Sequence, residues 1–194
     1  MKIIPILVSL SACLLVQGVS AFEVETIRYT HSTNSMNDVS MDFKGKVFKP
    51  SLDVLNPKGV VRDAEYKRFQ EFFKKLYERN TQGTESAIIS VWHPHDHNEI
   101  RKAMDKPSLE KNKATFNAMT SMKINMIIHF GSYYICFVET VMPGQSPSVL
   151  KFPVTEYQGE LVLTNGLNGD YFYELISHYL DETNFRPLLE QKTP

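Results

Sequence analysis

The chain has 194 residues, a formal net charge of −1 and two cysteines. Its length and apolar content predict a single domain with a hydrophobic core of its own. It contains no basic run that would attract a polyphosphate backbone, which argues against nucleic acid as a partner. Beyond the first 21 residues, no apolar stretch has the length of a membrane span.

Residues 1–21 have the features of a signal peptide. Lys2 precedes an apolar run over residues 3–16, and residues 19–21 have the small-x-small form that signal peptidase cleaves. We expect cleavage after Ala21 and a periplasmic or secreted mature protein. An alternative interpretation places a lipid on Cys13 within a lipobox, but apolar residues follow this cysteine where a lipoprotein normally turns polar.

Residues 22–59 form a predicted N-terminal extension with one or two strands. Residues 22–29 alternate weakly between apolar and polar side chains, which predicts a first strand. Residues 40–48 predict a second strand, interrupted at Gly45 and closed by Pro50. Residues 60–182 are expected to form the main domain, and residues 183–194 form a tail.

A helix is predicted over residues 63–82, with Gly83 as its stop signal. Apolar side chains recur there with helical spacing and define one stripe: Phe69, Phe72, Phe73, Leu76 and Tyr77. The next apolar residues predict a short helix capped at Thr84 that runs as far as Trp92, although the strand propensity of residues 89–92 leaves a strand open. Further helices are predicted from Pro94, over residues 108–119 and over residues 171–180.

Residues 123–164 predict two hairpins that form an antiparallel sheet of four strands. We place the first turn at Phe130-Gly131 and the second at Gln158-Gly159. Strand alternation then puts two apolar sets on one inner surface. The sets are Ile124, Met126, Ile128, Tyr133, Ile135 and Phe137, and Leu150, Phe152, Val154, Leu161 and Leu163. Cys136 is expected to be a small buried hydrophobe that points away from this inner core.

Helices followed by a strongly bent antiparallel sheet resemble the nuclear transport factor two-like, or cystatin-like, cone. The segments HFGSYYICFVE and LKFPVTEYQGELVLTNGL are similar to the two hairpins of exported bacterial members, with Glu160 where Trp is common. The resemblance implies an α+β fold with helices packed on the concave face of a curved, mainly antiparallel sheet of four to six strands. It also implies a pocket between the helices and the sheet, and a homodimer through the outer sheet face, but no reaction.

The predicted function is binding of a small apolar ligand or a protein partner, without chemistry and without a cofactor. The expected lining of the pocket comes from the inner sheet face and the helices: Trp92, Met126, Ile128, Tyr133, Ile135 and Phe137. An alternative is a carbon-acid isomerase or hydrolase that uses Glu139 as a base and Tyr133 as a proton donor.

The stretch WHPHDHNE holds half of the six histidines of the chain. In an extended segment His93, His95 and His97 would project to one side and could bind zinc, which would give a metal-dependent enzyme as a further alternative. Pro94 and the acidic residues after it favour a helix start, where these spacings scatter the three imidazoles. We therefore predict no metal site here.

The outer sheet face is expected to carry a mixture of polar, aromatic and branched side chains. Its predicted members are Lys123, Asn125, Ile127, His129, Ser132, Tyr134, Cys136, Val138, Thr155, Tyr157 and Val162. Such a face is too apolar for a fully solvated surface. We predict that a second copy of the chain covers it in a homodimer, with residues 22–48 as the alternative cover.

Overall fold

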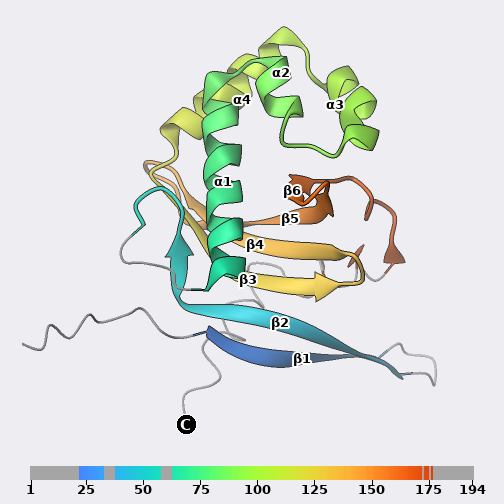
Figure 1. Cartoon of the computed structure of the whole chain (residues 1–194). Coiled ribbons are helices and arrows are strands. Elements are labelled where there is room, and N and C mark those ends of the chain that lie inside the picture. The colour runs from blue at the N-terminus through green and yellow to red at the C-terminus, as the bar shows by residue number, and fades with distance from the viewer. Residues whose placement is uncertain (1–21, 33–37, 58–62, 172, 175, 177–194) are drawn as a thin grey trace, which may run out of the picture.

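The computed structural model describes residues 22–32, 38–57, 63–171, 173, 174 and 176. It contains one six-stranded antiparallel sheet, and the helices pack against one face of it (Figure 1). The predicted α+β fold class is therefore confirmed.

The strands lie in the sheet in chain order, each antiparallel to the next. They are β1 Phe22–Ser32, β2 Asp38–Asp53, β3 Ser121–Phe130, β4 Tyr133–Val141, β5 Ser148–Tyr157 and β6 Glu160–Leu163. Both strands predicted in the N-terminal extension are present, and they extend the edge of the sheet without covering its face. β2 continues through Pro50, which lies in the register shift between Val47 and Leu52, where the ladder to β3 is interrupted.

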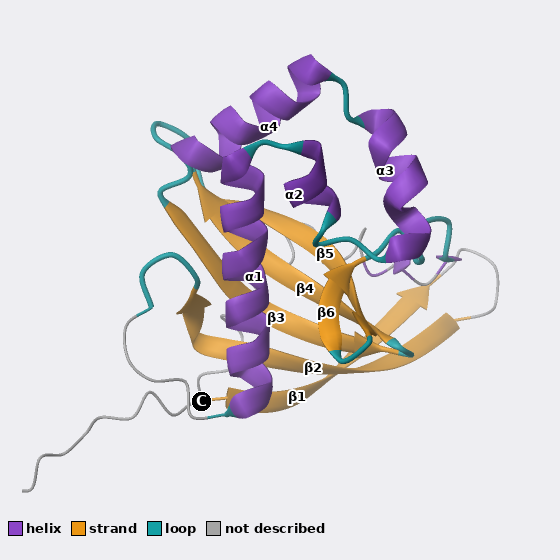
Figure 2. Ribbon diagram, turned by 45° about the horizontal axis from the view of Figure 1, so that its top comes forward, coloured by secondary structure: helices purple, strands orange, loops and turns teal. Residues whose placement is uncertain are grey.

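All of the helices described lie between β2 and β3 in the sequence, apart from a helical turn that begins at Tyr171. They are α1 Ala64–Gln82, α2 Glu85–Ile89, a 3₁₀ turn η1 Pro94–Asp96, α3 His97–Ala103 and α4 Lys106–Ala118. α1 crosses over the strands, and α2, α3 and α4 gather beyond one end of it (Figure 2). The predicted start and stop of α1 and the predicted cap at Thr84 are confirmed. The carboxylate of Asp63 and the hydroxyl of Thr84 accept backbone hydrogen bonds, and Gly83 has a φ of +67°.

The aromatic stripe of α1 forms the centre of the helix-covered core. Phe69, Phe72, Phe73 and Leu76 are all buried. The ring of Phe73 meets that of Phe152 on β5 edge to face, with 5.5 Å between ring centroids. The interpretation of this stripe as core is confirmed.

The first hairpin differs from its predicted register. Its turn lies at Gly131-Ser132, one residue later than expected, so that Phe130 pairs with Tyr133. A bulge then places Asn125 as an extra residue between Ile124 and Met126. A bulge reverses the alternation of side chains along its strand. As a result, Ile124 packs on the helix side of the sheet, whereas Met126 packs on the opposite side.

This register corrects the predicted inner surface. The second turn does lie at Gln158-Gly159, and Val154 pairs with Leu163 as predicted. Cys136 pairs with Phe152, however, and belongs to the helix-covered cluster, where it is fully buried. The prediction that it points away from this core was wrong. Ile135 and Phe137, assigned to the same surface as Val154, lie on the opposite face.

The C-terminal segment, meaning here the described residues after β6, packs on the face opposite the helices through Leu167, Tyr173 and Ile176. Leu167 and Ile176 complete a buried cluster there with the sheet residues Val47, Met126, Ile128, Ile135 and Phe137. Neither predicted cover had included this segment. The part of the predicted last helix beyond Ile176 lies outside the described residues.

The homodimer stays a prediction, but its expected surface changes. Four of the eleven side chains assigned to that surface pack in the helix-covered cluster: Ile127, Tyr134, Cys136 and Val138. Among the described residues, no helix is both long and apolar enough to cross a membrane.

Candidate ligand-binding site

A hollow of about 350 Å³ lies among the helices and the β5–β6 end of the sheet. Ten of its thirteen lining residues are apolar: Leu76, Ile88, Trp92, Ile100, Ala103, Met104, Leu109, Phe116, Phe152 and Leu163. The other three, Asn80, Ser108 and Asn112, are polar and uncharged. An apolar cavity with a few polar groups and this volume is typical of a site for a small molecule.

Trp92 reaches this hollow because the predicted short helix ends early. α2 stops at Ile89, and the chain then runs beside β6, where Trp92 forms a parallel bridge with Leu163. The backbone N–H of Leu163 donates to the Val91 carbonyl at 2.8 Å, and that of His93 donates to the Leu163 carbonyl at 2.8 Å. Residues 91–93 thus adopt the extended conformation that their strand propensity favours, after the end of α2. Trp92 is the only tryptophan of the chain.

The two helices α3 and α4 form the outer wall of the hollow. Neither helix has a fully buried residue. Four apolar side chains of this wall are half-buried and line the hollow: Ile100 on α3, Met104 directly after α3, and Leu109 and Phe116 on α4. α4 is held to α1 by the side chain of Lys113, which lies over Gly83, and by the rings of Tyr77 and Phe116, whose centroids are 6.2 Å apart.

Two hydrogen-bonded asparagine side chains, Asn80 and Asn112, line this mostly apolar hollow. The side chain of Asn80 is buried, and its Nδ2 donates to the Leu76 carbonyl at 2.7 Å. The Nδ2 of Asn112 on α4 donates to the Oδ1 of Asn80 at 2.7 Å. Neither asparagine was predicted as a site residue from the sequence. A signal was present for Asn80, because it follows Leu76 by four residues and continues the apolar stripe of α1.

The predicted site residues lie on two different faces of the sheet. Trp92 packs against the helix-covered cluster. The other five, Met126, Ile128, Tyr133, Ile135 and Phe137, belong to or pack against the cluster under the C-terminal segment. The predicted pocket that combines all six residues is therefore not formed, and only Trp92 lines the hollow.

The two residues of the enzyme alternative are far apart. Tyr133 begins β4 and Glu139 lies six positions later on the same strand. A strand rises roughly 3.3 Å per residue, which puts their Cα atoms about 20 Å apart. The two side chains cannot contact one small substrate together.

Two of the three imidazoles of the histidine stretch, those of His93 and His97, have structural partners. The Nδ1 of His93 accepts from the backbone N–H of His95 at 3.2 Å, and the Nε2 of His97 lies 2.9 Å from the Trp92 carbonyl. Buried Asp96 accepts from the backbone N–H of Asn165 at 3.0 Å. Within the described part of the chain, no group of three or more His, Cys, Asp or Glu side chains could hold a metal ion. This stretch connects the helices to the end of β6.

A second, smaller hollow of about 160 Å³ lies near the start of α1. Its charged groups are paired, since Lys46 contacts Glu65 at 2.6 Å and lies 4.7 Å from the centre of the Tyr66 ring. Tyr134 also lines it and stacks on His129, with ring centroids 5.1 Å apart. Burial raises the pKa of Tyr134, and the nearby carboxylate of Glu156 raises it further. Because these polar groups are already paired with one another, this hollow is a poorer candidate site for an apolar molecule than the first one.

Comparison of the chain with protein-family models, with curated proteins and with solved structures finds no match.

Proposed function

We propose that this protein is an exported binding protein that holds a small apolar molecule between α3–α4 and the β5–β6 end of the sheet. The observation that carries the proposal is the hollow of about 350 Å³, with ten apolar lining residues and no charged one. Sites for small molecules are concave, mostly apolar and few per protein.

The packing of α3 and α4 supports this proposal. Half-buried Ile100, Met104 and Leu109 face a space that no side chain of the described residues fills. A ligand that removes this apolar surface from water gains roughly 25 cal/mol for each Å² that it buries. The hollow thus offers a driving force to an apolar molecule without any charged contact.

Two sequence observations support the remaining parts of the proposal. Export rests on the leader over residues 1–21, and a mature N-terminus at Phe22, read by mass spectrometry, tests it. The similarity to the nuclear transport factor two-like, or cystatin-like, cone agrees with a hollow between helices and one face of an antiparallel sheet. This similarity adds a fold precedent for binding but no reaction.

Trp92 supplies the test, because the only tryptophan of the chain lines the hollow. Titration of the mature protein with cyclohexane should change the Trp92 emission along a saturable curve. Bound ligand should also raise the midpoint of thermal unfolding in a concentration-dependent way.

Two leucine variants make the test specific. Leu109→Glu places a carboxylate in the hollow and should abolish the titration, because burying an unpaired charge is unfavourable. Leu150→Glu is the matched control, since Leu150 is 42% exposed and lies outside the hollow. An unsaturable response, or equal binding by Leu109→Glu and the wild type, would contradict the proposed function.

A further inference from the structure

The carboxamides of Asn80 and Asn112 have fixed orientations. Asn80 donates through Nδ2 to the carbonyl of Leu76, which belongs to the same helix and can only accept. The Oδ1 of Asn80 is therefore the atom that faces α4. Asn112 must present its own Nδ2 to this oxygen, as the 2.7 Å contact shows. The Oδ1 of Asn112 is thereby left on the other side of its carboxamide.

Asn112 lines the hollow, and its Oδ1 is an acceptor that the Asn80 contact leaves free. Among the described residues, none donates a hydrogen bond to Asn112 Oδ1, whereas Asn80 Oδ1 accepts from Asn112. The third polar residue of the lining, Ser108, donates through its backbone N–H and its hydroxyl to the carboxylate of Asp105 at the start of α4. A carbonyl oxygen in apolar surroundings gains most from a partner that donates to it.

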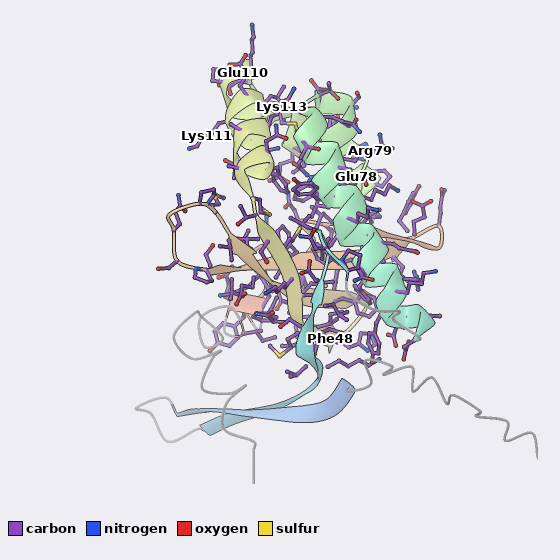
Figure 3. The ribbon with its side chains drawn as sticks, turned by 90° about the vertical axis from the view of Figure 1, so that its left-hand side faces the viewer. Phe48, Glu78, Arg79, Glu110, Lys111 and Lys113 are labelled. Atoms are coloured by element: carbon purple, nitrogen blue, oxygen red, sulfur yellow. The ribbon has the colours of Figure 1, made fainter. Side chains whose placement is uncertain are left out.

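The charged side chains of the neighbouring helices lie elsewhere. Figure 3 shows Arg79 on α1 and Glu110 and Lys111 on α4 projecting outward from their helices. None of the three lines the hollow. Because no lining side chain can neutralise an ionic ligand, a charged group would lose its hydration there without compensation.

We infer that Asn112 selects ligands that carry a hydrogen-bond donor. The ligand class is a small neutral molecule with an apolar body and a hydroxyl or N–H group, which donates to Asn112 Oδ1 while the body contacts Trp92, Leu109 and Phe116. The inference rests on the proposed function, since it assigns the polarity of a ligand in the same hollow.

Two isomers separate this selection from apolar binding. Cyclohexanol and cyclopentyl methyl ether have the same formula and similar size, but only the alcohol has an O–H donor. Followed by Trp92 emission, cyclohexanol should bind the wild-type protein about two- to tenfold more tightly than the ether, the effect of one net hydrogen bond. Asn112→Leu should remove this preference while cyclohexane still binds.

Asn117→Leu is the matched control, because it replaces an exposed asparagine on the same helix. It should keep the preference for the alcohol. Circular dichroism of each variant checks that the helices remain folded, and Asn112→Ala provides a second substitution at this site. Equal affinities of the two isomers for the wild type, or a preference retained in both Asn112 variants, would overturn the inference. Failure of cyclohexane to bind the wild type would instead overturn the proposed function.

Discussion

α1 and the α3–α4 pair lie on the same side of the sheet, yet they are packed in different ways. α1 buries six residues, whereas neither α3 nor α4 buries any. The apolar residues of α1 recur every three or four positions, but on α4 the two apolar side chains that line the hollow, Leu109 and Phe116, are seven apart. A dense stripe fills the space beneath a helix, while a sparse one leaves a hollow. α1 is therefore a core helix, whereas α4 is a wall of the candidate site.

The largest expected effect on stability comes from truncating an aromatic side chain of α1, and the same truncation on α4 is the matched comparison. Phe73→Ala should lower the free energy of unfolding by about 3–5 kcal/mol, because Phe73 is fully buried and its truncation leaves a cavity in the helix-covered core. Phe116→Ala on half-buried α4 should cost clearly less. Urea unfolding followed by circular dichroism measures both values. Equal losses would show that α4 is packed as tightly as α1.

The two regions also differ in how well the sequence predicts them. The bounds of α1 follow from local signals, namely Asp63, Gly83 and the aromatic stripe, and the structure confirms them. The faces of β3 and β4 depend on a turn one residue later than expected and on the bulge at Asn125. Nothing in the periodicity of this apolar stretch marks either feature, because both sheet faces are covered and both carry apolar residues.

The candidate site was predictable only in part. Trp92 was identified from its place on an apolar pattern, although it reaches the hollow through a strand-like bridge. Asn112 was not identified, because its role depends on a contact with Asn80 that spans 32 residues of sequence. The hollow itself arises from the sparse packing of α3 and α4 against distant elements, which is a tertiary property.

A second prediction concerns the densely packed region under α1 at alkaline pH. Complete burial raises the pKa of the Cys136 thiol well above its usual range. Above the ordinary thiol pKa of about 8.5, the unfolded chain loses this proton while the folded chain keeps it. The free energy of unfolding should therefore fall with rising pH, by up to about 1.4 kcal/mol per pH unit, until the folded thiol also ionises.

Cys136→Ala isolates this effect. The variant should be less stable than the wild type at pH 7 because of the lost side chain, but its stability should depend less on pH above 8.5. Other groups with a raised pKa, such as Tyr134, titrate in both proteins. Urea unfolding at pH 7, 9 and 10 compares the slopes, and identical slopes would show that Cys136 is accessible to water in the folded protein.

A third prediction addresses the joint between the two regions. Gly83 ends α1 in the left-handed conformation, and a Cβ atom there would lie 2.6 Å from a carbon of the Lys113 side chain. Gly83→Ala should cost about 1–2 kcal/mol, because a left-handed φ is unfavourable for an L residue. Lys113→Ala in the same background removes the Cδ and Cγ contacts but keeps the Cβ contact at 2.8 Å, so it should recover only part of this cost. Complete recovery would mean that the backbone conformation contributes nothing.

The smallest effect on stability is expected for a leucine of α4 that lines the hollow, although its truncation should weaken ligand binding. Leu109→Ala removes a half-buried side chain from α4 and should lower the free energy of unfolding by about 1 kcal/mol or less. The same change removes apolar surface from the lining of the hollow and should weaken cyclohexane binding severalfold.

Leu76→Ala truncates the same residue type on the α1 side of the hollow, where the side chain is buried, and should cost about 2–5 kcal/mol. Urea unfolding and Trp92 titration of both variants test the division between wall and core. If Leu109→Ala destabilised the fold as much as Leu76→Ala, α4 would be part of the core and the hollow would not be a preformed site.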